Sequence, residues 1–216
     1  MNRAVASSSS SASSSQAIAM TSLSLQDRAA WRPALVLALI TLLGFGVLYP
    51  LAGTGLARML FPARSTGSLV RAGDVVIGSS LLAQPFAGEG WFHPRPSAAG
   101  YDPMAAAGSN QARSNPDLRK RIDDAIAEVA AREHVTPAQV PADLVTQSGS
   151  GLDPDISPAA ARIQIARVAR GRGLSIEQVG ALVQAHTEGP QFGVLGQARV
   201  NVLTLNLAVE AKASKR

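Results

Sequence analysis

Residues 33–57 read PALVLALITLLGFGVLYPLAGTGLA, and none of them carries a charge. About 20–25 apolar residues, rising about 1.5 Å each in a helix, cross the roughly 30 Å hydrocarbon core of a bilayer. Trp31 and Tyr49 lie near the two ends of the run, where amphipathic rings favour the headgroup level. A cleaved signal peptide has a shorter core and an Ala-x-Ala site, which Leu51-Ala-Gly53 imitates only weakly. The run therefore predicts one transmembrane helix with its flanks over residues 31–57.

Four glycines lie in this run: Gly44, Gly46, Gly53 and Gly55. Small residues let the backbones of neighbouring membrane helices approach closely. Gly44 and Gly46 are therefore candidate helix-packing residues. The alternative is that glycine is simply commoner in membrane helices than in soluble ones, and the sequence gives the two interpretations equal weight.

The net charge of +5 and the pI near 10.4 come mostly from arginines around the apolar run. Arg28 and Arg32 precede the run, and Arg58, Arg64 and Arg71 follow it. Such flanks suit the anionic headgroups of a lipid bilayer. No basic stripe with interleaved aromatic residues is present, so we expect no nucleic-acid partner. Because arginines lie on both sides, the positive-inside rule does not orient the helix.

Residues 1–30 precede the run and contain an almost pure serine stretch, Ser7–Ser15, interrupted by Ala12. Such a stretch cannot bury enough apolar surface to offset the entropy lost on ordering, so residues 1–30 are predicted to be a disordered tail. A transit peptide would contain more arginine. The sequence leaves open whether translation starts at Met1 or at Met20.

The remaining residues, 58–216, are predicted to form a soluble domain of mixed helix and strand. Apolar runs on both sides of Gly73 predict a short β-hairpin, and Trp91–Arg95 predicts a further strand that prolines end. Residues 200–209 alternate as a strand does, yet Asn201 would also cap a helix, and both interpretations stay open. The predicted fold class is an α+β extramembrane domain with one N-terminal transmembrane α-helix.

Three helices in this domain are predicted from their starting signals. Asn115-Pro116 supplies an N-cap and a proline at the first helical position. Ser157-Pro158 repeats this signal for a second helix that should stop within residues 171–173, at a glycine. Ser175-Ile-Glu-Gln178 has the capping-box pattern of a third. The first helix carries an apolar stripe, namely Leu118, Ile122, Ile126 and Val129.

The sequence contains no recognisable catalytic motif. It has no cysteine, and His93, His134 and His186 lie too far apart for a metal-binding spacing. No Gly-Lys dipeptide occurs, so a Walker A loop is excluded, and neither Asp-Lys-Thr nor Gly-x-Ser-x-Gly is present. We therefore expect no catalytic residue, no metal and no covalently bound cofactor.

One loop, TQSGSGLDP from Thr146 to Pro154, has the composition of an anion-binding site. Hydroxyl groups and successive free amides can cradle a phosphate. The alternative, which composition favours, is a tight connection in which serine and aspartate cap neighbouring elements and the glycines supply positive φ. The candidate nucleotide- or partner-binding residues of this loop are Gln147, Ser148, Gly149, Ser150, Gly151 and Asp153.

Taken together, several segments resemble the C subunit of the Kdp high-affinity potassium-transporting P-type ATPase of bacteria. They follow one another in the family's order behind one membrane helix. Asp155 departs from the family, which usually has histidine after this Asp-Pro. The matching segments are Arg95-Pro-Ser-Ala98, Tyr101-Asp-Pro103, Gly108-Ser-Asn110, Pro141-Ala-Asp-Leu-Val145, Ser148-Gly-Ser-Gly-Leu-Asp-Pro154, Ile156-Ser157, Gln164, Arg167-Val-Ala169, His186-Thr-Glu-Gly-Pro190, Val200-Asn-Val-Leu203 and Leu205-Asn206.

The resemblance implies an accessory subunit without catalytic activity of its own. Its implied partners are a channel-like potassium-translocating subunit, a P-type ATPase catalytic subunit and a small membrane subunit. It also implies a single-pass protein of the bacterial inner membrane with a periplasmic C-terminal domain. The family's role as a catalytic chaperone implies that it supports assembly of the complex and raises the ATP affinity of the catalytic subunit, so ATP acts through the complex. The alternative is a membrane-anchored nucleotide-binding module that uses the Ser148–Asp153 loop.

Overall fold

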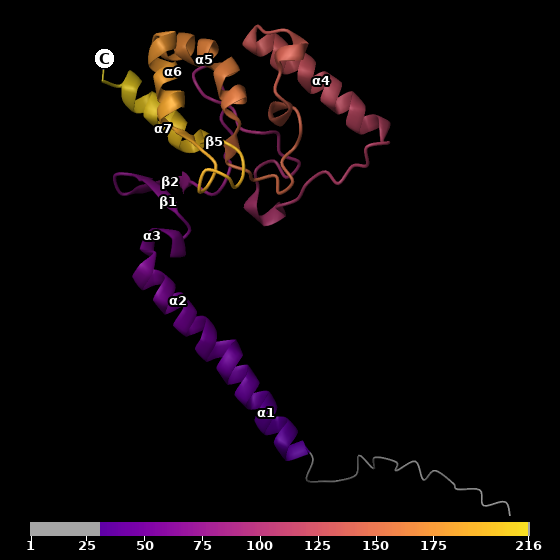
Figure 1. Ribbon diagram of the computed structural model, residues 1–216, viewed down its shortest axis with the longest axis vertical. Helices are drawn as coiled ribbons and strands as arrows, with labels where there is room; N and C mark the ends of the chain where they lie inside the picture. Colours follow the sequence, from indigo (N-terminus) through magenta and orange to yellow (C-terminus); the bar gives the residue numbers. More distant parts are fainter. Residues whose placement is uncertain (1–30, 216) are drawn as a thin grey trace, which may run out of the picture. The chain divides into compact units, whose positions relative to one another are not determined.

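The computed structural model describes residues 31–215, and the expected disordered tail of residues 1–30 lies outside them. The chain divides into two compact units, with the boundary between Gly55 and Leu56. The described part of the first unit is helical, and the second contains a hairpin, several helices and a small sheet (Figure 1).

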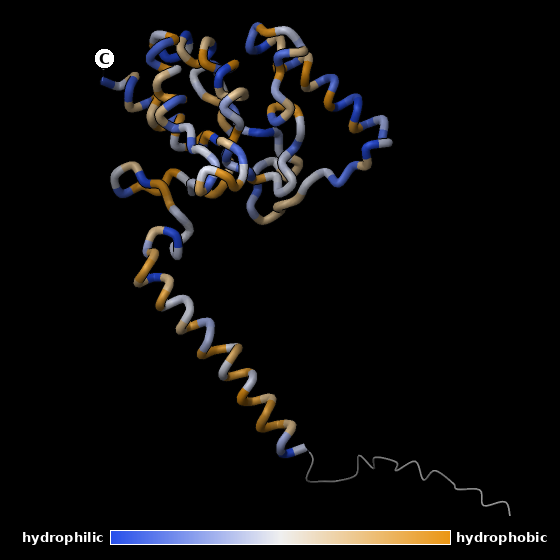
Figure 2. The backbone as a smooth tube through the Cα atoms, viewed as in Figure 1, coloured by the Kyte–Doolittle hydropathy of each residue, from blue (hydrophilic) through white to orange (hydrophobic). Residues whose placement is uncertain are grey.

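A continuous helix extends from Trp31 to Leu60 and is long and apolar enough to cross a membrane. Figure 2 shows apolar residues along most of its length. The predicted helix is therefore confirmed, and it continues past its predicted end at residue 57. It consists of α1 (Trp31–Leu43), a π-helical turn (Gly44–Leu48) and α2 (Tyr49–Leu60).

The π-helical turn has a local cause in the sequence. The N–H of Tyr49 donates to the carbonyl oxygen of Gly44, one residue further back than in an α-helix. Pro50 follows directly, and a proline ring inside a helix clashes with the carbonyl four residues earlier, here that of Gly46. Widening the turn before Pro50 relieves this clash while the helix continues.

The predicted hairpin around Gly73 is confirmed. After α3 (Pro62–Ser65), strands β1 (Leu69–Ala72) and β2 (Val75–Ser79) pair antiparallel. Gly73 has φ 60° and takes the first of the two turn positions, a conformation that glycine adopts without steric cost.

The three predicted helices are also confirmed, with their caps. The side chains of Asn115, Ser157 and Ser175 each accept a hydrogen bond from a backbone N–H in the first turn of their helix. The second helix ends at Gly173, whose φ of 65° is left-handed. The helices are α4 (Pro116–Glu133), α5 (Pro158–Arg172) and α6 (Ile176–Ala185), and 3-10 turns lie at Pro103–Ala105, Pro137–Gln139 and Ala142–Leu144.

Residues 200–209 contain both of the elements that the sequence left open. Strand β5 (Arg199–Asn201) lies between β3 (Asp155–Ile156) and β4 (Thr187–Glu188) in an antiparallel sheet. Helix α7 (Val202–Ala213) follows at once, because the side chain of Asn201 accepts a hydrogen bond from Thr204 N–H and caps it.

Helix α5 lies at the centre of the domain core, and α4, α6, α7 and β5 all contact it. Its residues Ala160, Ala161 and Val168 are fully buried. Val179 from α6 and Leu205 from α7 are fully buried in the same apolar cluster. Because full burial of one such aliphatic side chain contributes about 1.5–3 kcal/mol, this cluster sets the positions of the polar groups carried by α5.

The prediction of a strand at Trp91–Arg95 is wrong. The segment is irregular, although Phe92 within it is completely buried. A buried backbone must have hydrogen-bond partners, and here side chains from two helices, α5 and α7, supply them in place of a neighbouring strand. Pro94 and Pro96 add to the irregularity because they have no N–H to donate.

Candidate functional site

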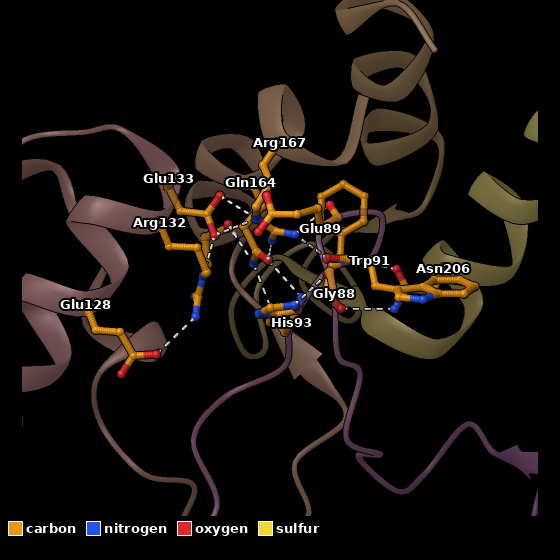
Figure 3. A network of polar contacts seen from close by, with 12 residues as sticks. Gly88, Glu89, Trp91, His93, Glu128, Arg132, Glu133, Gln164, Arg167 and Asn206 are labelled. Carbon is orange, nitrogen blue, oxygen red and sulfur yellow. Dashed lines mark hydrogen bonds and ion pairs between the residues drawn. The ribbon is translucent and has the colours of Figure 1, made fainter. Parts of the chain in front are cut away.

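A buried ion pair joins two helices inside the domain (Figure 3). Nε of Arg167, on α5, lies 3.0 Å from Oε2 of Glu133, the last residue of α4, and the two side chains are 1% and 0% exposed. Nε of Arg132 lies 2.9 Å from the other carboxylate oxygen. Removing a charge from water costs several kcal/mol unless it is paired, so each buried side chain requires the other.

The same guanidinium holds the chain that precedes Phe92. Nη1 of Arg167 donates to the backbone carbonyls of Glu89, at 2.9 Å, and Trp91, at 2.8 Å. A second arginine binds the same segment. The Arg172 guanidinium lies 3.6 Å from the centre of the Trp91 ring, and its Nε donates to the Gly90 carbonyl at 2.8 Å. Cation–π contact and hydrogen bonding thus fix this turn together.

Two side-chain amides provide the hydrogen-bond partners of the backbone at the next two residues, Phe92 and His93. Oε1 of Gln164 accepts from His93 N–H at 2.8 Å, and its Nε2 donates to the His93 carbonyl at 3.2 Å. Asn206, on α7, does the same for Phe92, with distances of 2.8 Å and 3.0 Å. Both amides are fully buried, so they replace a neighbouring strand for this segment.

The His93 ring lies beside this network. Burial lowers its pKa below the ordinary 6.5, and the positive charges of Arg167 and Arg132 lower it further. A ring nitrogen is 3.2 Å from the Gly88 carbonyl oxygen. The neutral ring is therefore favoured near neutral pH, and the arrangement is that of a packed side chain.

A second polar cluster contains the candidate loop. Nη1 of Arg95 lies 2.8 Å from Oδ2 of Asp153, and the hydroxyl of Tyr101 donates to the Arg95 carbonyl at 2.9 Å. Burial raises the pKa of Tyr101, so the hydroxyl stays protonated as a donor. Oδ1 of Asp153 accepts from the N–H of Asp155 at 3.1 Å. Segments that the sequence placed far apart thus meet around one ion pair.

Within the loop, the serine hydroxyls bind the loop's own backbone. Oγ of Ser148, a buried residue, accepts from Gly151 N–H at 3.1 Å and from Asp153 N–H at 3.3 Å. Oγ of Ser150 accepts from Leu152 N–H at 3.1 Å. These contacts form a folded turn in which serine side chains cap successive amides.

The two loop glycines are not equivalent. Gly151 has φ +73°, and a Cβ built on it would lie 2.9 Å from the Ala107 carbonyl oxygen and from Ala99 Cβ. Gly149 has no positive φ, and its Cβ would meet no atom within 4 Å in the described part of the chain. The expectation of positive φ is confirmed for Gly151 and wrong for Gly149. Gln147 accepts through its backbone carbonyl oxygen, which lies 3.5 Å from Nη2 of Arg95.

The candidate helix-packing glycines lie in the π-helical turn. A Cβ on Gly44 would meet nothing within 4 Å among residues 31–215, and one on Gly46 would meet only Leu42 Cδ1, at 3.5 Å. Both positions therefore present open backbone at the helix surface. A partner helix at this face stays a prediction.

No group of three or more metal-binding side chains occurs between residues 31 and 215. The resemblance contains Gln164, Arg167 and Asn206 among its matching residues, but neither these three nor Glu133 was predicted from the sequence as a site residue. A signal for it exists: Glu133 continues the apolar stripe of α4, four residues after Val129. A carboxylate on the buried face of a helix indicates a buried cationic partner.

The structure defines a class of protein: an α+β domain that follows an apolar helix long enough to cross a membrane and that contains a buried polar network. Residues 31–211 match the family described as KdpC: K+-transporting ATPase, c chain. The chain belongs to this family.

Curated relatives agree with this assignment. The chain is 58% identical over 190 residues to the potassium-transporting ATPase KdpC subunit of Xanthomonas campestris pv. campestris (strain B100), covering 88% of this chain and 91% of the relative. It is 52% identical over 165 residues to the subunit of the same name from Shewanella putrefaciens, covering 76% and 83%. For that of Rhodospirillum rubrum the identity is 52% over 187 residues, covering 84% and 95%.

Proposed function

We propose that this chain is the accessory C subunit of an ATP-driven potassium uptake complex in the bacterial inner membrane. The family match over residues 31–211 carries the proposal, because it includes the apolar helix and almost the whole domain. The partners are the channel-like, the catalytic and the small membrane subunits of that complex. The domain is periplasmic, and it has no catalytic activity of its own.

The subunit raises the ATP affinity of the catalytic subunit indirectly, by favouring one of its conformations. A tenfold change in affinity requires about 1.4 kcal/mol of coupling, which the packing of a rigid domain and a membrane helix can supply. The buried network around Arg167 supports this role because it holds residues 89–93, from the exposed Glu89 to the buried Phe92, in one conformation.

The geometry of the Ser148–Asp153 loop favours indirect action over the alternative of a nucleotide-binding module. The amides of Gly151, Leu152 and Asp153 already donate to serine oxygens of the loop, and a phosphate needs such amides free. Asp153 also places a carboxylate in the loop, and a carboxylate repels phosphate.

Two measurements test the proposal. Calorimetry of the full-length chain in detergent should show no ATP binding at micromolar concentration, whereas adding the chain to the other subunits should lower the ATP concentration for half-maximal hydrolysis. Ser150 is an exposed residue, and Ser150→Ala, which removes the hydroxyl that accepts from Leu152 N–H, should change neither result. If the chain alone binds ATP at micromolar level and Ser150→Ala weakens this binding, the loop is a nucleotide site and indirect action is wrong.

The orientation is tested separately. The sequence has no cysteine, so a single Ser114→Cys substitution at an exposed position gives a clean site for an impermeant maleimide. Labelling of cells with an intact inner membrane is expected for a periplasmic domain. Labelling only after lysis would place the domain in the cytoplasm.

A further inference from the structure

The β1–β2 hairpin exposes apolar side chains at its turn end. Val75 is 65% exposed and Val76 45% exposed. Since successive residues of a strand point to opposite faces, both faces of the hairpin present apolar surface. Burial begins only at its base, where Ser79 is 7% exposed. A two-stranded hairpin is at best marginally stable in water, so this end is suited to an apolar medium.

A short, hydrogen-bonded connection ties the hairpin to the end of the apolar helix. Phe61 N–H donates to the Ala57 carbonyl at 2.7 Å and extends the helical pattern beyond α2. At the hairpin base, Oγ of Ser79 donates to the Gly67 carbonyl at 2.7 Å. Residues 61–68, partly helical, span at most about 20 Å. The base of the hairpin at Leu69 therefore stays within that distance of the end of the apolar helix, and its turn lies one four-residue strand further on.

The charges of this region complement anionic headgroups. Between residues 57 and 80 the charged residues are Arg58, Arg64, Arg71 and Asp74, and all four are exposed. In the part of the chain that the structure describes, none of the three arginines forms an ion pair within 4 Å. Arg71 lies opposite Val76 in the hairpin, and exposed arginines in the same short stretch as exposed valines match the composition of interfacial membrane-binding segments.

We propose that the β1–β2 hairpin lies in the headgroup layer of the bilayer that the Trp31–Leu60 helix crosses. Val75 and Val76 reach the boundary of the acyl chains, about 5–10 Å deep as is usual for interfacial elements. Arg64 and Arg71 contact the phosphates of anionic lipids. The hairpin thereby acts as a second membrane contact that limits how the domain turns on its helix.

The test uses the full-length chain alone, reconstituted in nanodiscs of phosphatidylcholine with or without phosphatidylglycerol. Two separate variants, Val75→Cys and Val76→Cys, each contain one cysteine, which carries an environment-sensitive fluorophore. Ala127→Cys, at an exposed position, is the matched control. It belongs to α4, a helix that lies well away from the hairpin (Figure 1). Lipids with a nitroxide near the headgroup serve as quenchers.

We expect blue-shifted emission and strong nitroxide quenching at both hairpin sites, and neither at the control. Phosphatidylglycerol should increase the quenching, and Arg64→Gln with Arg71→Gln should cancel that increase. Equal quenching at hairpin and control sites would overturn the proposal. Hairpin probes that are shielded from aqueous iodide only after the partner subunits are added would overturn it too, because the hairpin would then be a protein interface. Neither result depends on ATP.

Discussion

The two glycines of the Ser148–Asp153 loop provide a matched pair for testing how this loop is held. Alanine at Gly151 must adopt φ near +73°, which costs about 1–2 kcal/mol for a residue with a Cβ. Its Cβ would also lie 2.9 Å from a backbone carbonyl oxygen and a methyl group, and such overpacking costs about 1–3 kcal/mol. We expect Gly151→Ala to lower the free energy of unfolding by about 2–5 kcal/mol.

Gly149→Ala is the control, because this residue has neither a positive φ nor a neighbour within 4 Å of an added Cβ in the described structure. Here alanine should be neutral or stabilise by about 0.4–1 kcal/mol, since it restricts the unfolded chain. The two alanine substitutions should thus change the free energy of unfolding differently, although the two glycines lie only two residues apart.

The assay is urea unfolding of the full-length chain in detergent, followed by tryptophan fluorescence. The sequence has two tryptophans, so a Trp31→Phe background leaves Trp91 as a reporter inside the domain. With a slope of about 2 kcal/mol per molar urea, the expected loss shifts the midpoint of Gly151→Ala by roughly 1–2.5 M. Equal midpoints for the two alanine variants would refute the packing of this loop described above.

Three further predictions concern the ion pair, the histidine and the membrane helix. Glu133→Gln leaves a buried guanidinium without its counter-charge and should lower the free energy of unfolding by about 3–5 kcal/mol. Glu128→Gln, at a carboxylate whose side chain is 76% exposed, should leave the urea midpoint unchanged. Equal midpoints for the two variants would contradict a buried pair. Burial lowers the pKa of His93 in the folded state, so its contribution to stability is complete above the ordinary value of 6.5 and is lost as pH falls below it. His93→Gln should therefore flatten the dependence of the free energy of unfolding on pH in that range. An unchanged dependence on pH would show that the ring is not the group responsible. Leucine at Gly44 or Gly46 should preserve membrane insertion and reduce co-purification with the partner subunits by separating helix backbones; full co-purification of both variants would make the helix a simple anchor.

The sequence by itself determined the elements whose causes are local. A charge-free run from Pro33 to Ala57 has enough length and hydropathy to form a membrane-crossing helix in any context. The caps at Asn115, Ser157 and Ser175 were predictable because each side chain bonds a backbone N–H no more than three residues away.

Tertiary structure alone decided the features whose partners are distant in the chain. Residues 91–95 look like a strand, but Gln164 and Asn206, 71 and 114 residues away from their partners, provide the backbone contacts that a neighbouring strand would supply. Glu133 becomes a buried charge only because Arg167 packs against it. Which side chains reach a buried backbone over such separations depends on which helices pack together in the core, and a local sequence pattern does not predict that packing.

The candidate loop shows the same division within six residues. Its serine and glycine content predicted either a phosphate cradle or a capped turn, because both use the same short-range chemistry. The folded segment from Ala99 to Ala107 packs against Gly151 and leaves Gly149 open. Composition could not separate the two glycines, since the difference between them arises from a neighbour about fifty residues earlier in the chain.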